Sequence, residues 1–254
     1  MSPGTRTSGL LAALLDFVYP PHCPACESWQ APGDREALCR RCIADLQDPL
    51  GPRCPRCGAP RQRGSGSSGP ECPNCAGWPE VDFSRAVVLT DLEGPAQSAV
   101  HALKFTGVRR IGPLLGRLLA TAPETAGALS DLDLMVPVPL HPARQRERGF
   151  NQADLIARGA AGALGVPVRG DLVRRVRPTR QQARLLAADR AGNLAGAFAP
   201  AGSAAGSPRA IGLVDDVLTT GSTLSACAAV LAEAAPGAEV RAIAVAGPFR
   251  RPRR

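Results

Sequence analysis

Hydrophobic residues form two kinds of segment along the last two thirds of the chain, short aliphatic runs and longer stretches with helical spacing. The aliphatic runs predict buried strands at residues 85–92, 133–140, 211–217 and 240–247. Apolar residues that recur every three or four positions predict helices at residues 94–105, 111–122, 151–164 and 222–234. Strands that alternate with helices in this way indicate an α/β fold, in which helices cover both faces of a mostly parallel sheet.

The N-terminal segment 9–21 has leucines at helical spacing and predicts a short packing helix. A secretory signal is the weaker alternative, because the apolar run is short and is interrupted by Asp16. No stretch of the chain approaches the ~18 consecutive apolar residues of a membrane span. We therefore expect a cytoplasmic protein without membrane insertion.

Composition agrees with a globular protein, since 44% of the 254 residues are hydrophobic and 20% are charged. Glycine, serine and proline concentrate in residues 64–70 and 199–208, which predicts loops or linkers. The pattern of the chain changes near residue 80. We expect an N-terminal helix with a small cysteine-rich module at residues 1–80, followed by the α/β domain at residues 81–254.

The net charge of +8 favours anionic partners such as phosphates, nucleotides or nucleic acid, although a solvated basic surface has the same composition. Arginine supplies almost all of the positive charge, and Lys104 is the single lysine of the chain. A lysine kept among so many arginines suggests a site that requires a compact ammonium group. The alternative is an ordinary surface lysine.

Eight of the nine cysteines form four Cys-x-x-Cys pairs, a spacing that lets one tight turn direct two sulfurs at one metal ion. The pairs are Cys23 and Cys26, Cys39 and Cys42, Cys54 and Cys57, and Cys72 and Cys75. Sequential pairing predicts one structural Zn²⁺ for the first four cysteines and a second for the last four; interleaved pairing and metal-free thiols are the alternatives. Cys227 lies in an alanine-rich helical pattern and is expected in the core.

The two zinc ions would replace a hydrophobic core that residues 20–78 cannot build from few apolar side chains. A structural or docking role is therefore expected first. Binding of nucleic acid is the alternative, with phosphate contacts from Arg35, Arg40, Arg41, Arg53, Arg56, Arg61 and Arg63. Only two aromatic residues suited to base stacking, Trp29 and Trp78, are present in this region.

The segment IGLVDDVLTTGST, residues 211–223, joins a predicted strand to a predicted helix. Asp215 and Asp216 come at the end of the strand, where parallel sheets bind their ligands. The hydroxyl-rich loop that follows leads into a helix N-terminus, which attracts anions. Its residues are Thr219, Thr220, Gly221, Ser222 and Thr223, and the glycine permits close approach of a phosphate to the backbone. The two carboxylates can accept hydrogen bonds from vicinal hydroxyls or approach Mg²⁺, so that a sugar phosphate with a bound cation fits the whole segment.

Residues 213–223 resemble the phosphoribosyl pyrophosphate (PRPP) motif of type I phosphoribosyltransferases. Four further segments resemble the ComF family, also called the ComF/GntX group, whose members are competence-associated and carry an N-terminal double zinc ribbon. These segments are LLDFVYPPHCPAC at 14–26, LKF at 103–105, VPVPLHPARQRERGFNQA at 136–153 and RPTRQQARLLAADRAGNLAGAF at 177–198. The resemblance implies a type I phosphoribosyltransferase-like fold and extends over nearly the whole chain.

The resemblance also implies roles for individual residues. Asp215 and Asp216 would hold the ribose hydroxyls, and residues 219–223 would hold the 5′-phosphate of PRPP, with Mg²⁺ as the accompanying cation. The pyrophosphate loop would consist of Val138, Pro139, Leu140 and His141, with Arg148 nearby and Lys104 directed at the phosphates. Positive charge at residues 144–148 supports this assignment, although these residues would also suit a solvated helix start.

The resemblance leaves the acceptor of the phosphoribosyl group open. The segment with Thr179, Gln181 and Gln182 occupies the place of the catalytic hood but shares little with purine or pyrimidine transferases. The implied biological role is DNA uptake or processing, with single-stranded DNA and a helicase-type protein as partners. The alternative is a non-catalytic regulator or adaptor that senses PRPP.

Overall fold

The computed structural model describes residues 21–31, 36–48, 51–61, 72–76, 78–177, 196–204 and 206–249. The helix expected at residues 9–21 lies almost wholly outside these ranges, and the expected hood residues Thr179, Gln181 and Gln182 lie outside them as well.

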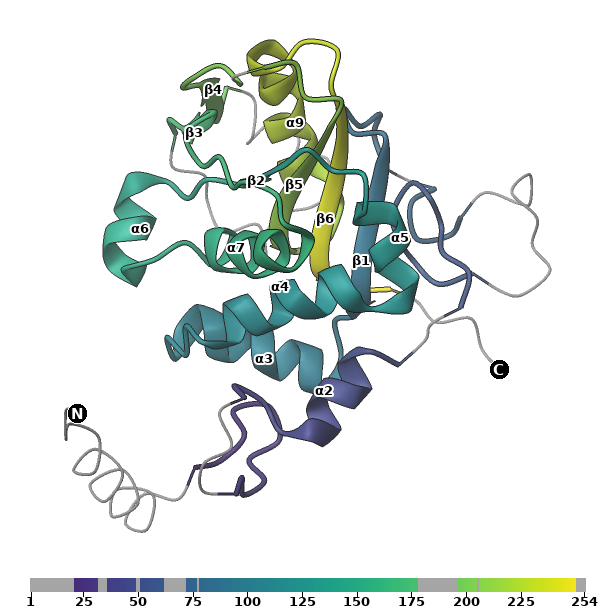
Figure 1. The fold of residues 1–254 in the computed structure, drawn as a ribbon, viewed down its shortest axis with the longest axis vertical. Helices are drawn as coiled ribbons and strands as arrows, with labels where there is room; N and C mark the ends of the chain where they lie inside the picture. Colours follow the sequence, from purple (N-terminus) through teal and green to yellow (C-terminus); the bar gives the residue numbers. More distant parts are fainter. Residues whose placement is uncertain are drawn as a thin grey trace, which may run out of the picture.

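Four parallel strands form the central sheet of the described chain, in the order β1-β6-β5-β2 (Figure 1). The strands are β1 (Arg85–Asp91), β2 (Leu134–Pro137), β5 (Ala210–Val217) and β6 (Glu239–Gly247). All four strands expected from the aliphatic runs are confirmed. Strand β2 ends earlier than expected because proline cannot extend the ladder, although the Val138 amide still donates a hydrogen bond of 2.8 Å to the Val214 carbonyl.

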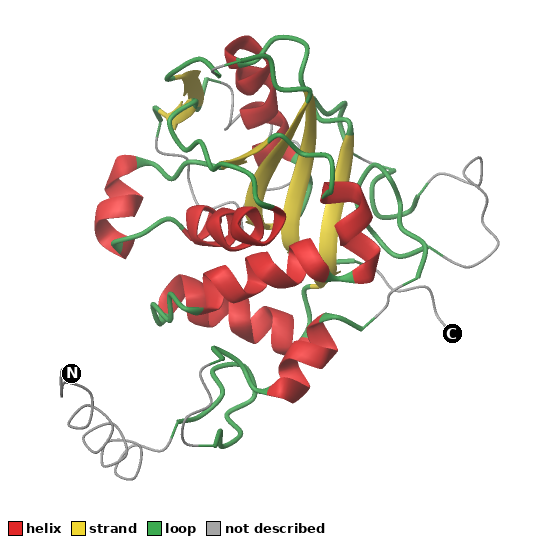
Figure 2. Cartoon of the chain, viewed as in Figure 1, coloured by secondary structure: helices red, strands yellow, loops and turns green. Residues whose placement is uncertain are grey.

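Helices cover both faces of the sheet, as the alternating pattern predicted (Figure 2). The first face carries α3 (Gly94–Phe105), α4 (Ile111–Thr121), α5 (Pro123–Leu129) and α7 (Gln152–Leu164), and the second face carries α9 (Ser222–Ala234). Neighbouring strand residues alternate between these faces. Val87 and Ile243 pack with the first group of helices, whereas Val88 and Ala242 pack with α9.

Helices α4 and α7 pack closely through glycines. A Cβ atom on Gly116 would lie 2.0 Å from the Ile156 carbonyl oxygen, and one on Gly159 would lie 2.2 Å from the Pro113 carbonyl oxygen. No larger side chain fits at either position without separating the helices. This contact holds α7, and with it the residues that begin the helix, beside the end of β2.

Three short elements of the α/β domain were not predicted from the sequence, and a fourth, α6 (Pro142–Arg148), agrees with the helix start given as the alternative for residues 144–148. Helix α5 begins at Pro123, and helix α6 lies between the end of β2 and α7. Strands β3 (Val173–Arg175) and β4 (Phe198–Pro200) pair in an antiparallel sheet apart from the main one. Each of these strands has three residues, too few for a periodic pattern to be recognised.

The N-terminal region forms two similar zinc-ribbon turns. Backbone hydrogen bonds of 2.8 Å close both turns, from the Glu27 amide to the Cys23 carbonyl and from the Gly58 amide to the Cys54 carbonyl. Gly58 has a φ of 72°, in agreement with the turn role expected for it. The first ribbon continues into α2 (Arg40–Leu46), which packs against α3.

The two ribbons belong to different hydrophobic clusters. Cys23 and Cys42 of the first ribbon share a hydrophobic cluster with α3 and α4, whereas Cys54 and Cys57 of the second share one with α9. The second ribbon also bonds to the outer side of β1. The Ala86 amide donates to the Pro55 carbonyl at 2.9 Å, and this contact covers part of a sheet edge.

Candidate functional site

The acidic pair lies at the carboxyl end of β5, where the sequence predicted it. Asp216 is buried, with 7% of its surface exposed, and its Oδ1 atom lies 2.8 Å from Nζ of Lys104. The Asp215 Oδ1 atom accepts a hydrogen bond of 2.8 Å from the Asp216 amide. The carboxylates are thus held in different ways, Asp216 by an ion pair and Asp215 by the backbone.

Burial raises the pKa of Asp215 to about 7, and the neighbouring Asp216 charge adds to this effect. Lys104, the Asp216 amide and Arg175 oppose it, because each stabilises the carboxylate form. Asp215 therefore changes its protonation state near neutral pH. The protonation state of such a carboxyl group changes readily when a cation or a hydroxyl group binds beside it.

Lys104 comes from the last turn of α3 and lines the same pocket as the acidic pair. The sequence predicted that its ammonium group faces the phosphates of a ligand. In the ligand-free chain the group contacts Asp216, and 25% of the side chain remains exposed. The structure places Lys104 within the site, and its contact with a phosphate stays a prediction.

The hydroxyl-rich loop connects β5 to α9. Thr219, Gly221 and Thr223 line the pocket, whereas the hydroxyls of Thr220 and Ser222 bond to each other at 2.9 Å. Gly221 has a φ of 75° and stands immediately before the first residue of α9. The loop therefore requires glycine for its backbone conformation as well as for close approach.

A contact from the second ribbon adds a further constraint at Gly221. A Cβ atom at this position would lie 2.9 Å from Cζ3 of Trp78 and 3.4 Å from Cζ of Phe83. The side of Gly221 that a methyl group would occupy is therefore already covered by aromatic rings. Sequence reasoning missed this contact because Trp78 and Gly221 are far apart in the chain and no local pattern connects them.

The turn after β2 forms the opposite wall of the pocket. Val138, Leu140 and His141 line it, whereas Pro139 belongs to the turn without being among the lining residues. The Asn151 side-chain amide donates a hydrogen bond of 3.0 Å to the Val138 carbonyl. Its Oδ1 atom accepts from the Ala153 amide at 3.1 Å, so that the start of α7 anchors the turn.

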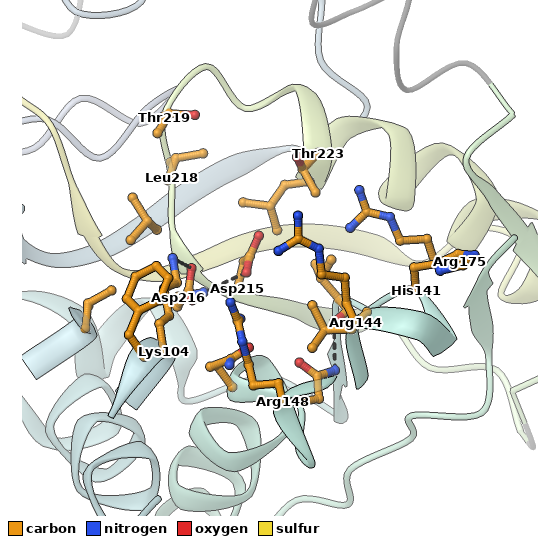
Figure 3. A pocket seen from close by; sticks show the side chains of 18 of the residues that line it. Lys104, His141, Arg144, Arg148, Arg175, Asp215, Asp216, Leu218, Thr219 and Thr223 are labelled. Carbon is orange, nitrogen blue, oxygen red and sulfur yellow. Dashed lines mark hydrogen bonds and ion pairs between the residues drawn. The ribbon is translucent and has the colours of Figure 1, made fainter. Parts of the chain in front are cut away.

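Three arginines bring positive charge to this wall of the pocket (Figure 3). Arg144 and Arg148 come from α6, a solvent-exposed helix without buried residues. Both arginines line the pocket. Arg175 comes from β3, and its guanidinium carbon lies 5.3 Å from the centre of the Phe198 ring. Burial lowers the pKa of Arg175, and the nearby Asp215 charge offsets only part of this effect. The sequence did not single out Arg175, because the position of β3 above the site depends on tertiary packing.

The pocket that these elements enclose has a volume of about 780 Å³. Asp215 and Asp216 occupy its floor at the end of β5, and basic groups come from α3, α6 and β3, with Glu147 of α6 as a further acidic lining residue. A molecule with anionic ends and a hydroxyl-bearing centre complements this distribution of charge. The described part of the chain thus brings together the predicted acidic pair, three residues of the predicted phosphate loop, and the turn after β2.

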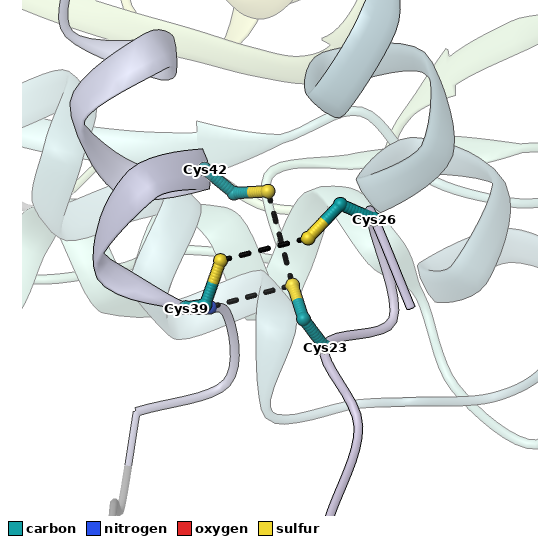
Figure 4. A group of neighbouring side chains, drawn as sticks. All are labelled: Cys23, Cys26, Cys39 and Cys42. Atoms are coloured by element: carbon teal, nitrogen blue, oxygen red, sulfur yellow. Dashed lines mark hydrogen bonds between the residues drawn. The ribbon is translucent and has the colours of Figure 1, made fainter. Parts of the chain in front are cut away.

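Two groups of four cysteines form the candidate metal centres. Cys23, Cys26, Cys39 and Cys42 make one group, and Cys54, Cys57, Cys72 and Cys75 make the other; within each group all sulfurs lie within 4.8 Å of one another (Figure 4). The sequential pairing expected from the sequence is therefore confirmed.

The sulfur positions fit zinc. Sγ atoms of Cys23 and Cys42 are 3.8 Å apart, and those of Cys57 and Cys72 are 3.7 Å apart. A tetrahedral site with Zn–S bonds of about 2.3 Å has edges of about 3.8 Å. Cys227 is buried in the core, as expected, and lies outside both groups.

Two arginines proposed for nucleic-acid contacts have structural partners instead. Arg53 donates hydrogen bonds to the carbonyls of Gly58 and Leu89, at 3.1 and 2.8 Å. Arg56 donates to the carbonyls of Trp78 and Pro79, at 3.2 and 2.8 Å. Arg40 and Arg41 are exposed at the start of α2.

The mostly parallel sheet with helices on both faces and the two four-cysteine groups define an α/β protein with an N-terminal double zinc ribbon. A family model described as a double zinc ribbon domain matches residues 14–76. Competence protein F of Haemophilus influenzae is 35% identical over 195 residues, which cover 75% of this chain and 82% of the relative. DNA utilization protein YhgH of Salmonella typhi is 37% identical over 181 residues, which cover 70% and 77%. The chain belongs to the family of these two proteins, and the resemblance to the ComF family is confirmed.

Among solved structures, purine phosphoribosyltransferase from Pyrococcus horikoshii Ot3 matches 66% of this chain and 95% of its own, with 12% identity and a TM-score of 0.26. The strand order and the arrangement of helices define the fold class. None of the helices in the described residues is long and apolar enough to cross a membrane.

Proposed function

We propose that this chain binds PRPP together with Mg²⁺ in the pocket at the carboxyl edge of the sheet. The observation that carries the proposal is the position of Asp215 and Asp216 beside a hydroxyl-rich loop at the N-terminus of α9. A ribose 5-phosphate needs this combination, acceptors for two hydroxyls next to donors for a phosphate.

Each wall of the pocket has a role in the proposed complex. Asp215 and Asp216 accept hydrogen bonds from the ribose hydroxyls, and residues 219–223 donate to the 5′-phosphate. The turn at residues 138–141, with Arg144 and Arg148, faces the diphosphate. The Lys104 ammonium group, which contacts Asp216 in the ligand-free chain, also contacts the diphosphate in the proposed complex. It acts there as a compact point charge, unlike the planar guanidinium group of arginine.

The acidic pair is also a suitable donor set for Mg²⁺. Asp215 is half-buried at the pocket floor and forms no ion pair among the contacts described above, whereas Asp216 is paired with Lys104. Mg²⁺ commonly binds to one or two carboxylates and to substrate phosphates. When bound, it supplies charge that neutralises the diphosphate.

The proposed reaction is transfer of the phosphoribosyl group. The bond between ribose C1 and the diphosphate oxygen breaks, its electron pair leaves with the diphosphate, and a lone pair of the acceptor forms the new bond at C1. Arg144 and Arg148 stabilise the negative charge of the leaving group. The carboxylates beneath the sugar stabilise positive charge that develops on the ring.

A role in DNA uptake or utilization follows from the names of the relatives, Competence protein F and DNA utilization protein YhgH. We propose a cytoplasmic protein whose partners are single-stranded DNA and a helicase-type protein. Binding of a single-stranded oligonucleotide by the full-length chain, measured at several salt concentrations, tests the first partner. Strongly salt-dependent affinity supports it, and absence of binding at low salt contradicts it.

A non-catalytic PRPP sensor is the second candidate. The contact between Trp78 and Gly221 favours it, because the second ribbon touches the loop that would hold the phosphate. A partner bound to the ribbon would then respond to occupancy of the loop. Release of pyrophosphate from PRPP in the presence of candidate acceptors distinguishes a transferase from a sensor.

Calorimetry with PRPP and Mg²⁺ tests the binding proposal itself. We expect saturable binding by the wild type, and an affinity lower by about 1 to 3 kcal/mol in Asp216→Asn, which loses charge-assisted hydrogen bonds. Asp171→Asn is the matched control, since Asp171 is an exposed carboxylate paired with Arg169 outside the pocket. Equal affinities in both variants would contradict the assignment of the acidic pair.

A further inference from the structure

Trp78 is connected through its backbone to both halves of the second four-cysteine group. Its amide donates a hydrogen bond of 3.1 Å to the Cys75 carbonyl. Its carbonyl accepts one of 3.2 Å from Arg56, which lies between Cys54 and Cys57. The position of Trp78 therefore depends on the geometry of the four sulfurs at this centre.

The Trp78 ring rests against the loop that follows β5. A Cβ atom on Gly221 would lie 2.9 Å from Cζ3 and 3.2 Å from Cε3 of the indole. Gly221 stands in the left-handed region and immediately precedes α9. The ring thus supports the loop at the residue whose backbone conformation starts the helix.

A second contact fixes the first turn of α9 to the same segment. The Ser225 hydroxyl accepts a hydrogen bond of 3.0 Å from the Asp82 amide and donates one of 2.6 Å to the Asp82 carboxylate. The Ser225 amide bonds in turn to the Gly221 carbonyl at 2.8 Å. Residues 78–82 therefore hold both the loop and the helix start.

The first ribbon packs elsewhere. Cys23 and Cys42 share a cluster with α2, α3 and α4, and the tryptophan of this ribbon, Trp29, is 59% exposed. The described ion pair between this ribbon and the α/β domain joins Glu36 to Arg117 of α4, outside the pocket. The second metal centre is thus connected to the loop through Trp78, whereas the described contacts of the first centre lie elsewhere, although the sulfur geometry of the two centres is similar.

We propose that Trp78 is a positioning residue through which zinc at Cys54, Cys57, Cys72 and Cys75 sets the conformation of the loop at residues 218–223. The first four-cysteine centre has no such effect on the loop. The consequence for PRPP rests on the proposed function: a loop without the support of Trp78 presents its amides and hydroxyls in a poorer geometry for the 5′-phosphate.

Hydrogen exchange in the ligand-free, full-length protein tests the positioning role without PRPP. In Trp78→Ala we expect amides at residues 219–224 to exchange about tenfold faster, with unchanged exchange at the turn 138–141 and two zinc equivalents retained. Trp78→Phe should restore part of the protection, because a smaller ring still contacts Gly221. Trp29→Ala is the matched control and should leave exchange of the loop unchanged. Unchanged loop exchange in Trp78→Ala would overturn the proposal.

The dependence on zinc is tested in the same way. Cys54→Ser and Cys26→Ser should each lose one zinc equivalent by metal analysis, but only Cys54→Ser should accelerate exchange at residues 219–224. In a Trp29→Phe background Trp78 is the remaining tryptophan, so its emission reports the contact directly. Emission should shift to longer wavelength in Cys54→Ser and stay constant in Cys26→Ser. Equal effects of the two cysteine variants would overturn the coupling.

PRPP binding completes the test. Trp78→Ala should weaken PRPP affinity about tenfold, within the usual range for coupling between sites. If the wild type fails to bind PRPP while the exchange results are as expected, the proposed ligand is wrong and the positioning role stands. If PRPP binds equally to the wild type and to Trp78→Ala, the consequence inferred for the 5′-phosphate is wrong and the proposed ligand stands.

Discussion

The Lys104 ammonium group lies 2.8 Å from Oδ1 of Asp216, and this ion pair joins the end of α3 to the end of β5. Lys104 is also the single lysine in a chain that otherwise uses arginine for positive charge. The partner of this lysine is a buried carboxylate at the floor of the pocket. An ion pair in this position holds the Lys104 ammonium group at the floor of the pocket, close to the proposed position of the diphosphate.

Replacement of Lys104 by arginine should weaken PRPP binding although the charge is retained. The larger planar guanidinium cannot occupy a site shaped for a compact ammonium, so we expect an affinity lower by about tenfold. Calorimetry with PRPP and Mg²⁺ measures the effect. Arg117→Lys, at an exposed ion pair outside the pocket, is the control and should bind PRPP as the wild type does. Unchanged affinity in Lys104→Arg would mean that this side chain does not meet the ligand.

The affinity for PRPP should rise with pH through neutrality. Asp215 has a pKa of about 7, so it is mostly protonated near pH 6 and mostly ionised near pH 8. Ribose hydroxyls and Mg²⁺ both prefer the carboxylate, and we expect affinity to rise about tenfold over this interval. Asp215→Asn should remove this part of the pH dependence, while any part due to the phosphates of PRPP remains. The same pH profile in both proteins would assign the effect to another group.

The stability of the ligand-free protein should change with pH in the opposite direction. The folded pKa of Asp215 is raised above its unfolded value of 3.8, so the folded protein holds the proton more tightly. The contribution of this group to stability is full below about pH 4 and is lost as pH rises through about 7. Asp215→Asn should therefore be more stable than the wild type near pH 8, on the order of 4 kcal/mol, and nearly equal to it near pH 4. Urea denaturation at both pH values measures the difference, and a variant less stable than the wild type near pH 8 would contradict the raised pKa.

Much of this architecture could be predicted because it depends on local periodicity. The aliphatic runs around Val87 and Leu213 marked strands that proved to be buried on both faces. The Cys-x-x-Cys spacing likewise indicated which sulfurs share a centre, since a turn of four residues acts locally. The acidic pair was placed at the ligand edge because the carboxyl ends of parallel strands share that edge.

Features that arise from tertiary packing could not be predicted in this way. Arg175 reaches the pocket through a three-residue strand whose position above the sheet has no sequence signal. Trp78 lies in a cysteine-rich segment with no periodic pattern, and its contact with Gly221 depends on the docking of the second ribbon. The packing of the two ribbons in different hydrophobic clusters is likewise not indicated by the spacing of their cysteines.

Substitution of Gly221 by alanine should test the loop with the smallest possible change. A φ of 75° disfavours any residue with a Cβ, and the added methyl group would lie 2.9 Å from the Trp78 ring. We expect a loss of about 1 to 2 kcal/mol in the free energy of unfolding. The loop should also shift, so that the folded variant binds PRPP more weakly than the wild type does.

Gly162→Ala is the matched control, because Gly162 lies in α7 and a Cβ there would meet nothing within 4 Å. Alanine at this position should stabilise the helix by about 0.5 to 1 kcal/mol and leave PRPP affinity unchanged. Urea denaturation and calorimetry on both variants measure the two quantities separately. Wild-type affinity in a folded Gly221→Ala protein would show that the phosphate binds elsewhere in the pocket.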